Sequence, residues 1–238
     1  MATTIWGTSS SWTLTALPLF VWMGEILFRT KLSENLFKGL SPWLSKLPGG
    51  LIHVNVVGCG LFAAISGSSA ATVATVGKMS IPELRKRKYP EKILLGSLAG
   101  SGTLGLLIPP SIILIIYGVT IEDSIAKLFM AGILPGIMLA IIFMLYVVIW
   151  SILNKNQMPK ISENFTLVEK IKRSKQLLPV VLLILAVIGS IYTGIATATE
   201  AASLGVVGAL ILSLLQGTLN KNSFKLSLLG ATKTSCMI

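Results

Sequence analysis

Charged residues are scarce in this chain, and histidine and cysteine are scarcer still. Of its 238 residues, 12% are charged, one is a histidine and two are cysteines, while 53% are hydrophobic. The cysteines, Cys59 and Cys236, fit no disulfide framework and no metal-ligand spacing. Several apolar runs reach the ~20 residues that cross a bilayer. The sequence therefore predicts an all-α membrane protein, a polytopic helical bundle.

The motifs of soluble enzymes are also missing. The chain has no Gly-x-Ser-x-Gly elbow, no phosphate-binding Gly-x-x-x-x-Gly-Lys and no paired His or Cys ligands. Its net charge of +11 does not come with the interleaved basic and aromatic residues of a nucleic-acid face, so we expect no nucleic-acid partner. An intramembrane serine hydrolase stays open as an alternative, with His53 as its only available base.

Apolar runs predict membrane spans near residues 5–28, 93–119, 133–153, 177–193 and 201–219. Two shorter stretches are amphipathic. Between Leu36 and Leu47, apolar residues recur at helical spacing opposite Glu34, Lys38 and Lys46, which predicts a helix lying in the membrane interface. A second helix is predicted from Ile121 to Ala131, with Thr120 and Asp123 at capping-box spacing.

The segment from Gly49 to Ser80 is apolar or small almost throughout, with the helix-breaking run Ser66-Gly-Ser-Ser near its centre. It is too long for one crossing of ~20 residues and too short for two, which predicts a re-entrant hairpin. With that hairpin, all of the 20 basic residues except Lys127 fall on one side of the membrane. We predict that this side, which includes the C-terminus, is cytoplasmic.

A second interruption is predicted between Gly96 and Ser111, where four glycines and the pair Pro109-Pro110 fall inside one span. We expect a discontinuous helix whose second half begins at Pro109. Transporters use the free carbonyls and helix ends of such breaks to hold ions and substrates. For Gly96, Gly100 and Gly205, close helix packing is the favoured interpretation.

Titratable groups within the spans have local explanations. Glu25 precedes Arg29 by one helical turn and predicts an ion pair, while Glu200 follows Thr197 at capping-box spacing. The lone His53 is expected to make a local hydrogen bond. The groups that remain to bind an ion are uncharged oxygens, which suit Na+ better than a proton. They are freed backbone carbonyls and the side-chain hydroxyls of Ser66, Ser68, Ser69, Thr103 and Ser111.

Five segments together resemble the large membrane subunit of TRAP transporters, the DctM-like permeases. They are Pro18–Glu25, Ile65–Thr72 (Ile-Ser-Gly-Ser-Ser-Ala-Ala-Thr), Gly105–Ile112 (Gly-Leu-Leu-Ile-Pro-Pro-Ser-Ile), Leu128–Gly136 and Thr197–Ala202. The resemblance covers essentially the whole chain.

The resemblance implies a multi-pass subunit of the bacterial inner membrane that takes up an organic acid, a carboxylate, by Na+ symport. It also implies two partners, a small membrane subunit and a periplasmic binding protein, and no cofactor besides the transported Na+. The implied Na+ site consists of Ser66, Gly67, Ser68, Ser69, Gly102, Thr103 and Pro109. The implied substrate contacts are Ser69, Ala70 and Ser111.

The resemblance further implies one half of an inverted-repeat, elevator-type transporter. Residues 1–48 would hold a transmembrane helix and the interfacial helix, 49–120 the hairpin and broken helix of the transport domain, 121–219 the scaffold and arm helices, and 220–238 the start of a second repeat. We expect a partial chain, without the family's first helices and second repeat, that does not transport alone. Two alternatives stay open: a non-transporting scaffold fragment and a channel-like protein.

Overall fold

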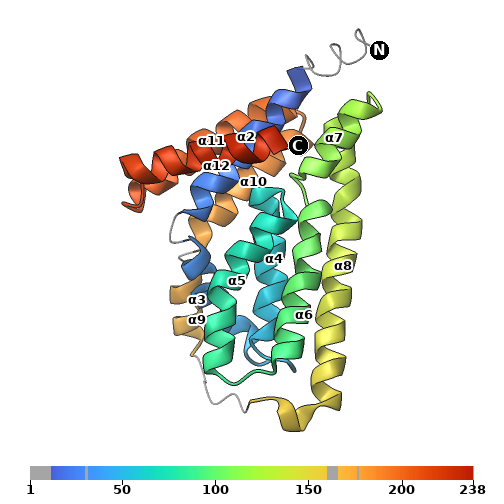
Figure 1. Ribbon diagram of the computed structural model, residues 1–238, viewed down its shortest axis with the longest axis vertical. Helices are drawn as coiled ribbons and strands as arrows, with labels where there is room; N and C mark the ends of the chain where they lie inside the picture. The colour runs from blue at the N-terminus through green and yellow to red at the C-terminus, as the bar shows by residue number, and fades with distance from the viewer. Residues whose placement is uncertain (1–11, 30–31, 160–165, 176, 238) are drawn as a thin grey trace.

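The computed structural model describes residues 12–29, 32–159, 166–175 and 177–237, which form helices and contain no strand (Figure 1). This confirms the predicted all-α class. Within these ranges, the 3-10 helices are η1 (Trp12–Thr15), η2 (Thr103–Leu106) and η3 (Lys155–Gln157). The α-helices are α2 (Ala16–Phe28), α3 (Leu32–Leu44), α4 (Ile52–Ser66), α5 (Ser69–Lys86), α6 (Glu91–Gly102), α7 (Ile112–Thr120), α8 (Ile125–Leu153), α9 (Leu167–Ser174), α10 (Leu178–Tyr192), α11 (Ala198–Leu215) and α12 (Lys221–Met237).

The helices form two groups. In one, α11 and α12 pack on α2, and α10 packs on α11; in the other, α4, α5 and α6 pack on one another with α8 along their edge (Figure 1). The short helices α3 and α9 lie side by side. Helix α3 leads from α2 into α4, and α9 leads into α10. The pair of α3 and α9 therefore lies at the connections between the two groups.

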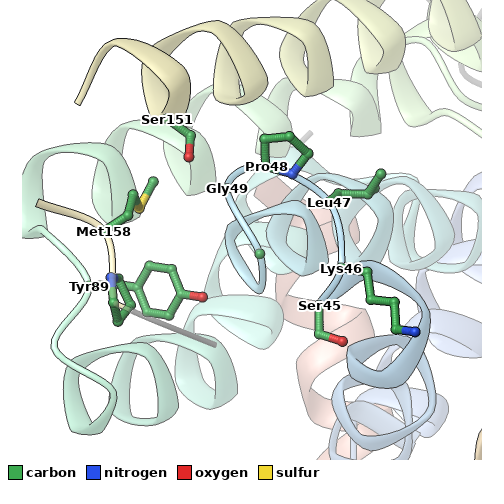
Figure 2. A pocket seen from close by; sticks show the side chains of 10 residues that line it. Ser45, Lys46, Leu47, Pro48, Gly49, Tyr89, Ser151 and Met158 are labelled. Atoms are coloured by element: carbon green, nitrogen blue, oxygen red, sulfur yellow. The ribbon is translucent and has the colours of Figure 1, made fainter. Parts of the chain in front are cut away.

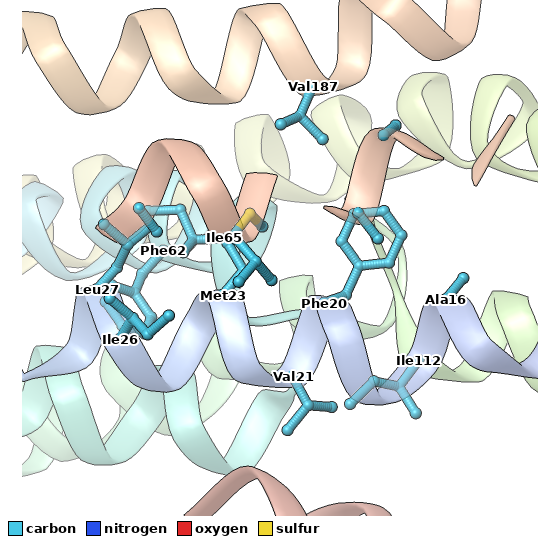
Figure 3. Close-up of a cluster of buried hydrophobic side chains, with 14 of the residues drawn as sticks. Ala16, Phe20, Val21, Met23, Ile26, Leu27, Phe62, Ile65, Ile112 and Val187 are labelled. Carbon is cyan, nitrogen blue, oxygen red and sulfur yellow. The ribbon is translucent and has the colours of Figure 1, made fainter. Parts of the chain in front are cut away.

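A continuous apolar core joins the groups. Figure 3 shows Phe20, Met23 and Leu27 of α2 beside Phe62 and Ile65 at the end of α4. All five side chains are at most 2% exposed. The far end of α4 is thereby held against α2 by close apolar packing, and van der Waals contact of this kind contributes to helix association in a membrane.

In the part of the chain that the structure describes, two helices, α8 and α11, are long and apolar enough to cross a membrane, and the bent pair of α9 and α10 would make a third. They correspond to the predicted spans 133–153, 201–219 and 177–193. One face of α8 is apolar yet uncovered, with Leu134 77% and Leu145 56% exposed. Such a face is costly in water and natural against lipid or further protein. The predicted span 5–28 is seen as α2, and residues 5–11 lie outside the described part.

The amphipathic helix predicted over Ile121–Ala131 is wrong at its start. Thr120 is the last residue of α7, and its hydroxyl donates to the carbonyl of Ile116 at 2.8 Å, so it cannot cap the next helix. The chain turns through Glu122, whose φ is +56°, and α8 begins at Ile125 with Ser124 as its N-cap. From there α8 runs unbroken, so this stretch and the predicted span 133–153 are one helix.

Three local predictions are confirmed. The Arg29 guanidinium lies 3.0 Å from the Glu25 carboxylate. Thr197 and Glu200 form a reciprocal capping box at the start of α11. His53 makes a local hydrogen bond, its Nε2 lying 2.7 Å from the Pro48 carbonyl oxygen.

The packing interpretation of the three glycines is confirmed at two of them. A Cβ on Gly205 would lie 2.5 Å from the Met23 sulfur, and one on Gly100 would lie 3.3 Å from the Phe143 ring. A Cβ on Gly96 would meet nothing within 4 Å among the described residues, so packing does not require a glycine there.

Candidate functional site

The hairpin segment folds as two helices that meet at a two-residue break. Helix α4 ends at Ser66, and Gly67 adopts the left-handed conformation with φ +58°. Ser68 is extended and caps α5, which begins at Ser69. Glycine suits this position because it reaches a positive φ without the clash that a Cβ causes. The break lies where the sequence predicts it, while its depth in a membrane stays a prediction.

The second interruption follows α6. After Gly102 the chain tightens into the 3-10 helix η2 (Thr103–Leu106), passes through irregular backbone, and resumes as α7 at Ile112. The prediction that the second half begins at Pro109 is therefore wrong. Pro109 itself precedes a proline, which disfavours the helical region, and the extended Ser111 provides the N-cap.

The two breaks face each other. The backbone N–H of Ile112 donates to the Gly67 carbonyl at 3.2 Å. A Cβ on Gly67 would lie 2.5 Å from the Pro110 carbonyl oxygen, and one on Gly105 would lie 2.9 Å from the Ser69 nitrogen. Only glycine lets the two backbones approach this closely, so the tip of the hairpin lies on the unwound part of the broken helix.

Helix α2 covers the tip from another side. A Cβ on Gly24 would lie 2.9 Å from the Ser66 Cα, so α2 also approaches at backbone distance. Figure 3 shows Ile65, which precedes the hairpin break, and Ile112, which follows the second break, among the side chains packed along α2. The site is thus placed by three elements that are far apart in the sequence.

The hydroxyls of the tip are differently engaged. Ser66 Oγ lies 2.9 Å from Thr72 Oγ1, and Ser68 Oγ accepts the Ala71 N–H at 3.4 Å as the N-cap of α5. Ser69 Oγ is buried and has no hydrogen-bond partner among the described residues. A buried hydroxyl without a partner costs free energy, which makes Ser69 the natural first ligand for something bound at the tip.

On the broken helix, Ser111 is buried and its Oγ donates to the Leu106 carbonyl at 2.8 Å. Thr103 is exposed, and its hydroxyl donates to the Gly100 carbonyl at 2.7 Å. Pro109 is buried and Ala70 is exposed. Of the predicted site residues, the structure places Gly67, Ser69 and Gly102 at the contact between the breaks, whereas the Thr103 hydroxyl is engaged on the exposed side.

The chain matches a known family along its length. The family model described as "Tripartite ATP-independent periplasmic transporter, DctM component" matches residues 1–238. The chain belongs to this family. The predicted resemblance to DctM-like permeases is thereby confirmed.

Several curated relatives are similar over most of the chain. The C4-dicarboxylate TRAP transporter large permease protein DctM of Pseudomonas aeruginosa is 36% identical over 87% of this chain and 48% of its own length. The ectoine/5-hydroxyectoine permease UehC of Ruegeria pomeroyi is 33% identical over 85% and 46%. The sialic acid permease SiaM of Vibrio cholerae is 34% identical over 87% and 48%. The chain spans about half the length of the curated relatives it matches.

Sequence reasoning missed two residues of this candidate site. Gly105 makes the closest approach to Ser69, and Thr72 holds Ser66 in place. Both lie in the segments that carry the family resemblance, Gly105–Ile112 and Ile65–Thr72, so the signal was present. What the sequence lacked was the tertiary contact that assigns each of them a role.

Proposed function

We propose that this chain forms part of the large permease of a TRAP-type transporter, which couples entry of Na+ to uptake of an organic acid. The observation that carries the proposal is the contact between the hairpin tip and the broken helix, with the unpartnered Ser69 hydroxyl beside it. Membership of the DctM family supports the transporter class.

The groups at this contact are suited to an alkali cation. The tip and the break offer hydroxyl and carbonyl oxygens, which hard cations prefer, and neutral oxygens bind a monovalent ion weakly enough for it to leave again. The proposed ligands are Ser66, Gly67, Ser68 and Ser69 from the tip, with Gly102, Thr103 and Pro109 from the broken helix. Thr103 would have to give up its hydrogen bond to Gly100 in order to contribute.

The substrate proposal is less specific. We propose an organic acid held near Ser69, Ala70 and Ser111, delivered by a periplasmic binding protein to a complex with a small membrane subunit in the bacterial inner membrane. The relatives are named for C4-dicarboxylate, ectoine and sialic acid, and a further relative is named an isethionate permease protein DctMQ. This range supports a family scaffold that accepts different solutes.

A direct test measures 22Na+ binding to the purified chain in detergent. Ser69→Ala removes an oxygen that has no internal partner, so we expect about tenfold weaker Na+ binding with no loss of thermal stability. Ser203→Ala is the matched control, because Ser203 bonds only to the Thr199 carbonyl within α11.

Equal Na+ affinity in the Ser69 and Ser203 variants would contradict the proposal. The small residues could instead only pack helices, as in a scaffold or channel-like protein. In that case Ser69→Leu would lower the unfolding temperature, and the shift of that temperature by Na+ would be the same in the variant and the wild type.

A further inference from the structure

A pocket of about 540 Å³ opens at the far end of the hairpin from its tip, where α3 leads into α4. Its walls come from four parts of the chain: the α3–α4 connection, the α5–α6 turn, the end of α8 and the segment after it (Figure 2). Among its lining residues are Ser45, Lys46, Leu47, Tyr89, Ser151 and Met158. The volume is within the range of ~300–1,000 Å³ typical of small-molecule sites.

Buried hydroxyls face this pocket. Ser151 is 6% exposed, and its oxygen points into the space (Figure 2). Tyr89 is equally buried and also points inward, and its oxygen accepts the Leu51 N–H at 3.1 Å. A hydroxyl that faces an open space is able to bond to a polar ligand that enters it.

One of the ten lining residues is charged, and it is a lysine. Lys46 is exposed at the rim, where its ammonium points away from Ser151 and Tyr89 (Figure 2). The ten lining residues include no aspartate or glutamate. A cation unopposed by acidic groups, together with hydroxyl donors, favours an anion, and a phosphate group can accept several such hydrogen bonds.

Close to the pocket along the chain, α3 carries a residue type that is common at membrane surfaces. Trp43, which is 50% exposed, donates its indole N–H to Ser174 Oγ at 2.8 Å, with the Lys170 ammonium 5.3 Å from its ring centre. Tryptophan and lysine side chains are typical of the headgroup level. Next to Ser151, α8 exposes Ile152 and Leu153, the latter by 77%, as an apolar surface that continues away from the pocket.

We infer that this pocket binds the phosphate-bearing headgroup of an anionic glycerophospholipid. Lys46, whose ammonium points away from Ser151 in Figure 2, turns inward to pair with the phosphate, and the Ser151 hydroxyl bonds to a phosphate or glycerol oxygen. Leu47 and Met158 cover the glycerol, and the acyl chains lie along the exposed apolar face of α8. Because the pocket joins the α3–α4 connection to α8, a bound lipid would stabilise that junction.

The test is native mass spectrometry of the full chain in detergent with added dioleoyl phosphatidylglycerol or dioleoyl phosphatidylethanolamine. We expect tighter binding of phosphatidylglycerol, weakened roughly fivefold by Lys46→Gln, the loss expected for one basic residue at an anionic surface. Ser151→Leu should block the pocket and reduce binding further. Lys127→Gln is the matched control, because it removes one exposed lysine at the opposite end of α8.

Equal binding of the two lipids, or equal losses in the Lys46 and Lys127 variants, would overturn the inference. Binding of soluble glycerol 3-phosphate as tight as that of phosphatidylglycerol would also overturn it, since the pocket would then take a free phosphate ester. A thermal shift of the wild-type chain by phosphatidylglycerol that persists in Ser151→Leu would place the lipid elsewhere.

Discussion

Gly67 combines two requirements that no other residue type meets. Its φ of +58° is in the left-handed region, and its Cα faces the Pro110 carbonyl at a distance that leaves no room for a Cβ. The residue therefore both turns the hairpin and sets the distance between the two breaks. Gly96, in the middle of α6, meets neither requirement.

This contrast predicts opposite effects of one substitution. Gly67→Ala should lower the free energy of unfolding by at least ~1–2 kcal/mol, from the left-handed conformation alone. Gly96→Ala should raise it by ~0.5–1 kcal/mol, because alanine loses less conformational freedom in a helix than glycine. Unfolding by SDS titration from mixed micelles measures both. Similar effects at the two positions would show that the tip contact does not constrain Gly67.

At the scale of single elements, side chains that accept from terminal N–H groups mark the starts of α5 and α11. Helix α11 is the clearest case, because Thr197 Oγ1 accepts the Glu200 N–H at 3.4 Å while the Glu200 carboxylate accepts the Thr197 N–H at 2.8 Å. Both orphan donors are satisfied within one turn.

Thr197→Ala should therefore cost ~1 kcal/mol in the free energy of unfolding, the usual value of an N-cap. Glu200→Gln should cost less, because glutamine can still accept from the Thr197 N–H. Thr193→Ala is the control, since the Thr193 hydroxyl only donates back to the Gly189 and Ser190 carbonyls of α10. Thermal unfolding in detergent compares the three, and an equal shift for Thr193→Ala would remove the cap as the cause.

At the scale of the whole molecule, the length of α8 can be compared with the thickness of a membrane. Its 29 residues extend ~43 Å at 1.5 Å per residue, which exceeds the ~30 Å hydrocarbon core. Lys127 lies near its start and Lys155 follows its end, so the two lysines stand at opposite ends of one continuous helix.

The proposed sidedness predicts that these ends face different compartments. In a Cys236→Ser background, a membrane-impermeant maleimide should label Lys127→Cys in intact spheroplasts and Lys155→Cys only after the membrane is opened. The native Cys59 is 0% exposed and should not be labelled by the maleimide. Labelling of both positions from outside would contradict the predicted orientation and, with it, the cytoplasmic assignment of the basic loops.

Much of this organisation could be predicted because it is local. The turn at Gly67 follows from a glycine within a serine run, the Thr197 cap from its spacing to Glu200, and the end of α6 from the glycines and prolines that follow it. The failures are also local competitions. Thr120 bonds backwards into α7, which its capping-box spacing does not reveal. Pro109 stays outside the helix because a proline follows it, a restriction that the pair Pro109-Pro110 already carries.

The sequence by itself determined the helical class, the apolar surfaces and the positions of both interruptions, because these depend on composition and on neighbours along the chain. Only the tertiary structure decided that the interruptions touch, since Gly105 and Ser69 approach through the packing of α4, α5 and α6. It likewise decided that the Ser69 hydroxyl at the tip has no partner among the described residues and that a pocket forms beyond α3. Such features depend on which backbones meet, and residues distant in sequence meet only when the helices pack.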